Sequence, residues 1–271
     1  MTPPGSRARA EALQRLHAAP ELLVIVNVWD AASARTVAAV PGCRALATAS
    51  WSIAAAHGVP DHEVMSRDAM LAAVQRIAAA VELPVSADLE AGYGTTPAEV
   101  GETVAAALEA GAVGCNLEDS TRDAAAPLRP VAQHAACVAA ARAAGERAGV
   151  PVVINARTDV FLAGVGEPDE RLELAVKRGR AYREAGADCI FVPAVTDADT
   201  IGALVEELRA PLSVLATPAG PSLDELQRLG VARASFGPGT MGAAMAALRD
   251  TAASLLAHEP LPQELAFRPP A

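Results

Sequence analysis

Acidic side chains recur at the ends of short apolar segments in this sequence. Asp88 and Glu90 end one such segment, and Glu118 ends the next. Asp61 lies in the loop after an earlier segment, and Arg157 ends a later one. Carboxylates that converge on one site repel one another unless a cation neutralises them. If the fold brings these segment ends together, the residues predict a metal site beside a substrate-binding arginine.

Mg²⁺ or Mn²⁺ is the ion that such a site would hold. Carboxylate oxygens suit hard cations, and Mg²⁺ is typically bound by few carboxylates together with waters and substrate. The histidines and cysteines do not have the spacing of a zinc site. The planar guanidinium of Arg157 would bind a carboxylate or phosphonate of the substrate. Asp119 and Asp159 follow the same segments, where capping of the next helix is an equal alternative.

Two glycine-containing turns follow apolar segments. Residues 92–94 (Gly-Tyr-Gly) come directly after Asp88-Leu89-Glu90 and predict a tight turn beside the metal site. Residues 237–240 (Gly-Pro-Gly-Thr) either offer amide groups to an anion or begin a helix. Trp51 and Tyr93 are candidates to line a pocket, with packing in the core as the alternative.

Eight short apolar segments alternate with alanine-rich segments of helical period. In one helical segment, Ile201, Leu204 and Leu208 recur at the spacing of a single helix face. The predicted strands are residues 22–26, 44–48, 84–88, 113–117, 152–156, 188–192, 212–216 and 232–236. Thr96 and Ser222 each stand three residues before a glutamate, which predicts a capping box at a helix start.

Eight β/α units predict an α/β fold, a (β/α)₈ TIM barrel formed as one domain by residues 1–271. Gly111, Gly186 and Gly230 each stand shortly before a predicted strand, as glycines at helix ends do. A doubly wound sheet is the alternative, but the first strand lacks the glycine-rich turn that such a sheet would carry. Residues 1–20 and a proline-rich arm, 258–271, are expected as extensions of the barrel.

Composition restricts the classes of partner. Of 271 residues, 52% are hydrophobic, and the net charge is −10, which argues against nucleic acid and anionic membrane surfaces as partners. No apolar run approaches the ~20 residues of a membrane span, and no secretory signal is recognised. The four cysteines are scattered without CxxC spacing, so reduced and mostly buried thiols are expected. We therefore expect a cytoplasmic protein.

Five motifs, in this order, resemble those of the isocitrate lyase/phosphoenolpyruvate mutase superfamily. They are NVWDAASAR (27–35), GVPD (58–61), ADLEAGYG (87–94), NLED (116–119) and NARTD (155–159). The resemblance implies a barrel whose last helix is swapped between paired subunits, in a homotetramer or a homodimer. It also implies a Mg²⁺ site that binds a 2-oxo acid or its enolate. The implied metal site, in part through water, consists of Asp61, Asp88, Glu90 and Glu118. The implied substrate-binding residues are Ala49, Ser50, Trp51, Asp61, Asp88, Arg157 and Thr217.

The sequence also departs from the superfamily pattern. The lyases carry a Lys-(Lys/Arg)-Cys-Gly-His loop whose cysteine is the acid/base, whereas residues 120–128 hold no Cys, His or Lys. The mutases and phosphonopyruvate hydrolases keep a lysine early in that loop, and none is present here. Glu90 stands where the pattern has the shorter aspartate. Ala194 and Leu215 stand where the lyases have a glutamate and an asparagine.

The residues that remain predict a Mg²⁺-dependent lyase acting on a small 2-oxo or 2-hydroxy dicarboxylic acid. The bond would break by C–C cleavage or decarboxylation through an enolate. Arg157, Glu118 and Thr121 are the expected catalytic residues. The proton donor would be a water on the metal or a group of the loop, such as Ser120, Thr121 or Arg122. The absent cysteine favours a smaller acid such as oxaloacetate. The alternatives are P–C bond chemistry of the phosphonopyruvate type and a 2-oxo-acid-binding protein with little activity.

Overall fold

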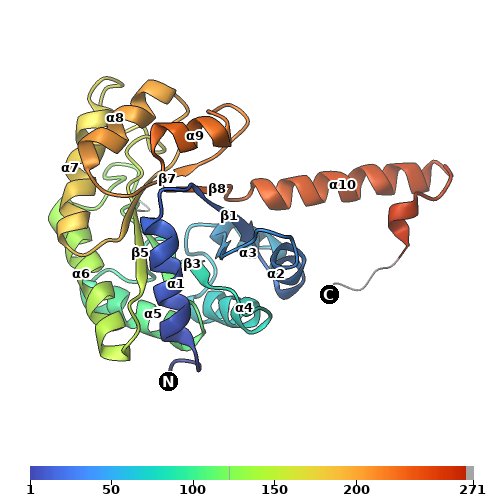
Figure 1. Ribbon diagram of the computed structural model, residues 1–271, viewed down its shortest axis with the longest axis horizontal. Helices are drawn as coiled ribbons and strands as arrows, with labels where there is room; N and C mark the ends of the chain where they lie inside the picture. The colour runs from blue at the N-terminus through green and yellow to red at the C-terminus, as the bar shows by residue number, and fades with distance from the viewer. Residues whose placement is uncertain (122, 267–271) are drawn as a thin grey trace.

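The computed structural model describes residues 1–121 and 123–266. Eight parallel strands close into a barrel in chain order, with the last strand hydrogen-bonded to the first (Figure 1). The strands are β1 (Leu23–Val28), β2 (Leu46–Thr48), β3 (Val85–Asp88), β4 (Gly114–Glu118), β5 (Val153–Arg157), β6 (Cys189–Val192), β7 (Leu212–Leu215) and β8 (Arg233–Ser235). The predicted (β/α)₈ barrel is confirmed, and each predicted strand boundary lies within two residues of the observed one. The alternative prediction of a doubly wound sheet is wrong, because the sheet is closed.

Helices connect the strands and cover the outside of the barrel, except for the last helix, which extends away from it (Figure 1). They are α1 (Ser6–Ala18), α2 (Ala31–Ala38), α3 (Ser50–Ala56), α4 (Arg67–Ala79), α5 (Pro97–Glu109), α6 (Val131–Ala148), α7 (Arg171–Glu184), α8 (Ala198–Leu208), α9 (Leu223–Leu229) and α10 (Gly239–Leu256). The expected arm, 258–271, contains a short 3₁₀ turn at Gln263–Leu265, and its residues 267–271 lie outside the described part of the chain. Among the helices described, none is long and apolar enough to cross a membrane.

Helix α1 packs at the start of β4. A Cβ atom at Gly114, the first residue of β4, would come within 2.8 Å of Leu13 Cδ2, so only glycine permits this approach. His17 is buried in the same helix, and its Nδ1 lies 2.9 Å from the Leu13 carbonyl. Burial, together with the charge of Arg233, lowers the pKa of His17 to about 4. The N-terminal extension is therefore largely a helix packed on the barrel.

The barrel interior is polar below its rim. Cys115 and Leu117 of β4 belong to the apolar layer between strands and helices, so the alternate residues of β4 face inward. Inward-facing Asn116 accepts a 2.7 Å hydrogen bond from the Asn155 amide of β5. Arg233 of β8, which lies on the opposite side of the closed barrel, reaches the same Asn116 oxygen at 3.5 Å. These buried polar residues form the floor beneath the rim.

Helix α10 extends away from the barrel (Figure 1). Met241 in its first turn is buried, but four further large apolar side chains are exposed, those of Met245, Leu248, Leu255 and Leu256. In the turn before it, the amides of Phe236 and Gly237 both donate to Asn27 Oδ1, at 2.8 and 2.9 Å. These amides are occupied within the protein, so residues 237–240 begin a helix and do not offer the Gly237 amide to an anion.

The capping box at the start of α5 is confirmed. The Glu99 amide donates to Thr96 Oγ1 at 3.3 Å, and the Glu99 carboxylate accepts the Thr96 amide at 2.9 Å. The Ser222 hydroxyl likewise accepts the Glu225 amide at the start of α9. Both caps satisfy amide groups that a helix start leaves without partners inside the helix.

Replacement of Thr96 by alanine is expected to lower the free energy of unfolding by about 1 kcal/mol, because the Glu99 amide loses its acceptor. Urea denaturation would measure this change. The control, Thr96→Ser, keeps the hydroxyl and should unfold close to wild type. An alanine variant with an unchanged midpoint and slope would show that the cap contributes nothing.

Candidate active site

A largely buried arginine lies on the rim, with 16% of its side chain exposed. Arg157, the last residue of β5, bonds Glu118 Oε2 through Nη1 at 2.7 Å. It also holds Asp159 with two bonds, from Nε to Oδ1 at 2.5 Å and from Nη2 to Oδ2 at 2.8 Å. Its guanidinium carbon lies 5.8 Å from the centre of the Phe191 ring. Burial raises the pKa of Glu118, and the neighbouring guanidinium opposes that rise.

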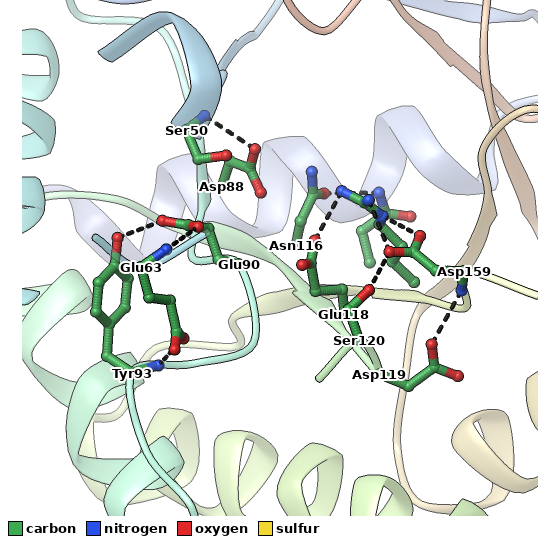
Figure 2. Close-up of polar contacts among 12 residues, drawn as sticks. Ser50, Glu63, Asp88, Glu90, Tyr93, Asn116, Glu118, Asp119, Ser120 and Asp159 are labelled. Carbon is green, nitrogen blue, oxygen red and sulfur yellow. Dashed lines mark hydrogen bonds and ion pairs between the residues drawn. The ribbon is translucent and has the colours of Figure 1, made fainter. Parts of the chain in front are cut away.

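A second layer of polar contacts fixes Asp159. The Ser120 hydroxyl donates to the Asp159 carboxylate, and the Asp159 amide donates to Asp119 Oδ1 at 2.9 Å (Figure 2). Asp119 is fully buried, and its other oxygen accepts bonds from Arg178 at 3.0 Å and from the Tyr182 hydroxyl at 2.7 Å. Both partners lie on α7. The helix-capping interpretation of Asp119 and Asp159 is therefore wrong, because both carboxylates bind side chains of the site and of α7.

Asp88 lies on the same rim, at the end of β3. Its Oδ2 accepts the Ser50 amide at 3.0 Å, where α3 begins (Figure 2). Its Oδ1 is buried and has no hydrogen-bond partner among the described residues, and the same holds for Asp61 Oδ1. A buried carboxylate oxygen without a partner carries a desolvation penalty that a cation would relieve.

Glu90 is the centre of a compact acidic cluster (Figure 2). Its carboxylate accepts the Glu63 amide at 2.6 Å and the Tyr93 hydroxyl at 2.5 Å, while Glu63 Oε1 accepts the Tyr93 amide at 2.6 Å. Burial, together with the charges of Asp88 and Asp61, raises the pKa of Glu90 to about 7 against its hydrogen bonds. Glu90 and Tyr93 have φ values of 52° and 53°, so the chain bends sharply here, as the predicted tight turn requires.

A cavity of about 600 Å³ opens beside these carboxylates. Its lining residues come from the loops after β2, β3 and β4 and from the start of α6: His62, Glu63, Glu90, Ala91, Tyr93, Gly94, Thr95, Glu118, Ser120, Thr121, Ala126, Leu128, Arg129, Pro130 and Gln133. Tyr93 therefore lines a pocket, which was one of its two predicted roles, the other being packing in the core. Arg129 fixes one wall, because its guanidinium donates to the carbonyls of Ala91 at 2.9 Å and Gly94 at 2.7 Å.

The remaining predicted residues are spread around the rim. Ala49 and Ser50 are buried, Trp51 is 49% exposed, and Thr217 is half-buried after β7. Thr121 is exposed, and its hydroxyl donates to the Ala126 carbonyl at 2.5 Å. The cavity described above is lined by three of the predicted site residues, Glu90, Glu118 and Thr121. It is lined by none of the predicted substrate-binding residues, which are Ala49, Ser50, Trp51, Asp61, Asp88, Arg157 and Thr217. The candidate proton donor at position 122 lies outside the described residues.

The four predicted metal carboxylates do not form a ready-made cage. Within residues 1–121 and 123–266, no three His, Cys, Asp or Glu side chains converge closely enough to hold an ion by themselves. Glu90 is engaged by Tyr93, and Glu118 is engaged by Arg157. Their oxygens are hard donors, and Asp61 and Asp88 each have a buried oxygen to offer. The residues therefore fit an ion bound through few carboxylates and several waters.

Two residues of the site were not predicted. Glu63 stands two residues after Asp61, and this second acid in the loop was the one available signal. Arg129 follows the loop of residues 120–128 and supports the Gly92–Gly94 turn through backbone carbonyls. Backbone carbonyl contacts leave no residue pattern, so no signal in the sequence points to this role.

The raised pKa of Glu90 predicts a pH dependence of stability. Because this pKa rises from 4.5 to about 7 on folding, the folded state binds the proton more tightly. The resulting stabilisation is complete below pH 4.5 and is lost as the pH rises through 7. In EDTA, urea midpoints between pH 5 and 8 should fall more steeply for wild type than for Glu90→Gln. The control Glu102→Gln, on the exposed face of α5, should follow wild type, and parallel profiles for all three would contradict the assignment.

The closed β/α barrel with carboxylates and an arginine at the carboxyl ends of its strands defines a class of small-molecule enzymes. The chain matches the family model described as phosphoenolpyruvate phosphomutase over residues 13–256, and it belongs to the isocitrate lyase/phosphoenolpyruvate mutase superfamily. Members of this superfamily are lyases and mutases that act on oxo acids, and this chain is an enzyme of that group.

Relatives of the chain include proteins of different activities. It is 31% identical to the phosphonopyruvate hydrolase of Variovorax sp. over 221 residues, which cover 76% of this chain and 72% of the relative. It is 30% identical to the 2-methylisocitrate lyase of Escherichia coli over 187 residues, which cover 66% of this chain and 61% of the relative. An uncharacterized protein of Mycobacterium tuberculosis is 30% identical over 244 residues, which cover 90% and 88%.

Solved structures share the fold. A protein of Burkholderia cenocepacia is 44% identical, with a TM-score of 0.86 over 92% of this chain and 99% of the other. Oxaloacetate acetylhydrolase in complex with its product oxalate is 26% identical, with a TM-score of 0.83 over 95% and 91%. Phosphonopyruvate hydrolase in complex with oxalate and Mg²⁺ is 27% identical, with a TM-score of 0.83 over 95% and 90%.

Proposed function

We propose that this protein is a Mg²⁺-dependent lyase that acts on a small 2-oxo or 2-hydroxy dicarboxylic acid. The observation that carries the proposal is the position of Asp88, whose carboxylate adjoins the Ser50 amide and keeps one buried oxygen without a partner. Arg157 lies on the same rim and presents a guanidinium to anions. The likeness to enzymes solved with oxalate, an analogue of a small enolate, supports this substrate class.

Mg²⁺ is the proposed cofactor, with Mn²⁺ as a substitute. Asp88 would hold the ion, with Asp61, Glu90 and Glu118 acting in part through water, because hard oxygens suit either cation. The likeness to phosphonopyruvate hydrolase in complex with Mg²⁺ supports the choice. When bound, the ion would polarise the substrate carbonyl and stabilise negative charge that develops on the enolate oxygen.

The residues of the chain would bind and orient the substrate. The backbone of Ala49, Ser50 and Trp51 would receive one carboxylate, and Arg157 would fix the orientation of the 2-oxo group through its planar fork. Thr217 would contact the substrate from β7. Glu118 holds Arg157 in place at 2.7 Å.

The proton would come from the loop after β4. Thr121 and Ser120 line the cavity beside Glu118 and are the hydroxyl groups within this loop. Ser120 already donates to Asp159, so its position depends on the arginine network. The loop has no cysteine, and this favours a small acid such as oxaloacetate over the tricarboxylates.

A second candidate is P–C bond hydrolysis or rearrangement of a phosphonopyruvate. The 31% identity to phosphonopyruvate hydrolase favours it, whereas the absence of lysine from residues 120–128 opposes it. A third candidate is a 2-oxo-acid-binding protein with little activity, which would use the same rim without a proton donor.

Proton and phosphorus NMR of the protein with Mg²⁺ would separate these candidates. The mixture would contain oxaloacetate, methylisocitrate, isocitrate and phosphonopyruvate, with an EDTA control. We expect EDTA-sensitive loss of a carboxylic acid, oxaloacetate first. Loss of phosphonopyruvate would establish the second candidate. If all four decayed only as in the control, binding without turnover would be the better account.

Arg157→Lys keeps the buried positive charge but cannot hold Asp159 and a substrate carboxylate with a planar fork. We expect turnover of the substrate identified by NMR to fall at least about a hundredfold, because misplacement of the bound acid is costly. Arg147→Lys on the exposed face of α6 is the matched control. If the Arg157→Lys variant kept the wild-type kcat and KM, the proposed role of Arg157 in substrate binding would be contradicted.

We further propose that the chain forms one domain, resides in the cytoplasm and assembles as a homodimer or homotetramer in which α10 covers the partner's barrel. The exposed apolar side chains of α10 support this assembly. Sedimentation velocity should give an oligomer for wild type and for Arg249→Glu, and a monomer for Leu248→Glu, because Leu248 is 61% exposed within one chain. A monomeric wild type would contradict the proposed exchange.

A further inference from the structure

Among the described residues, Arg233 is the largest side chain that is fully buried, and it lies inside the barrel. It extends from β8 to Asn116 of β4, where its Nη2 lies 3.5 Å from Oδ1. Its Nε and Nη1 atoms are buried and have no hydrogen-bond partner among the described residues. Within the same part of the chain, its guanidinium forms no ion pair, unlike Arg157 and Arg178. Arg233 is therefore a buried cation without a carboxylate in contact.

The surroundings of Arg233 are uncharged. Asn116 also accepts the Asn155 side chain at 2.7 Å, and Ser86 and Ser213 contribute buried hydroxyl groups without partners in the described chain. His17 is kept neutral, because its pKa is lowered to about 4. Burial lowers the pKa of Arg233 too, but an arginine stays protonated in proteins. The charge is thus permanent and poorly screened.

The rim of the site begins two residues beyond the asparagines that lie beside this charge. Asn116 and Asn155 lie two residues before Glu118 and Arg157 on β4 and β5, a rise of about 7 Å along each strand. A unit charge in an interior that holds little water acts strongly on other charges nearby. The charges of Arg233 and Asp88 interact, because the Asp88 charge opposes the lowering of the Arg233 pKa by burial.

We infer that Arg233 is a permanent charge under the site that strengthens binding of an anionic substrate and weakens binding of the divalent cation. The inference rests on the proposed function, since it concerns the ligands of that site. An anion on the rim is attracted to Arg233, whereas a cation held by the same carboxylates is repelled. Loss of the charge should change the affinities for the two ligands in opposite directions. Loss of packing in the floor would instead weaken the binding of both ligands, so the two roles can be distinguished.

The test is a pair of binding measurements on the full-length protein. Mn²⁺ binding would be followed by electron paramagnetic resonance, and oxalate binding to the Mn²⁺-loaded protein by calorimetry. In Arg233→Met, Mn²⁺ should bind about tenfold more tightly and oxalate about tenfold more weakly. Arg233→Lys keeps the charge and should stay within about threefold of wild type for both ligands.

Asn116→Asp provides an independent variant if Arg233→Met does not fold. The new carboxylate would lie against Arg233 Nη2 at nearly unchanged volume and cancel its charge, so it should shift both affinities in the same two directions. If Arg233→Met folds, the pKa of His17, measured by NMR, should rise from about 4. This measurement reports the loss of the Arg233 charge in the absence of any ligand.

The outcomes separate the inference from the proposed function. If wild type binds neither Mn²⁺ nor oxalate, the proposed function fails and the inference fails with it. If wild type binds both ligands and the charge-cancelling variants leave both affinities unchanged, the inference alone is overturned. If both ligands bound more weakly to the variants, Arg233 would have a packing role, and the inference would also be overturned.

Discussion

The ion pair between Arg157 and Glu118 is the interaction on which the rest of the site depends. A guanidinium buried at the rim of a barrel is stable only if its charge and its donors are matched. Glu118 and Asp159 match them with three short bonds, and the Phe191 ring lies along one side. These three bonds hold the guanidinium in one position at the rim, and only its remaining N–H groups are left to donate to a ligand.

This arrangement extends outward to the helices. Asp159 is held through its amide by Asp119, which in turn is held by Arg178 and Tyr182 of α7. The Arg157 guanidinium is thus fixed by contacts that end on the outer layer of the barrel. Within a low-dielectric interior, such a chain of charged hydrogen bonds is rigid when every member has a partner.

Two layers of opposite charge organise the barrel interior. The rim carries the carboxylates of Asp88, Glu90 and Glu118, while the floor carries Arg233 among neutral side chains. In the proposed function, the carboxylates would attract a divalent cation, and the floor would limit that attraction and favour an anionic ligand. A site of this kind would hold the metal loosely without substrate and more tightly once an acid is bound.

Much of the fold and part of the site could be predicted from the sequence. Strand and helix periods, the Thr96 cap and the glycines before strands are local signals, and they predicted the eight-stranded barrel. Acids at strand ends predicted which side chains lie on the rim, because parallel strands end together. Contacts between distant residues could not be predicted in this way, since Arg178 and Asp119 are 59 positions apart. The left-handed backbone at Glu90, with φ of 52°, also runs against its residue type.

The central claim is that Asp88, Ser50 and Arg157 together form the site for a metal and a small acid. The most direct measurement is a crystal structure of the protein grown with Mn²⁺ and oxalate, with the metal located by its anomalous scattering. The account predicts Mn²⁺ beside the Asp88 carboxylate and oxalate bonded to the Ser50 amide and the Arg157 guanidinium. Metal bound elsewhere, or oxalate out of reach of Arg157, would contradict it.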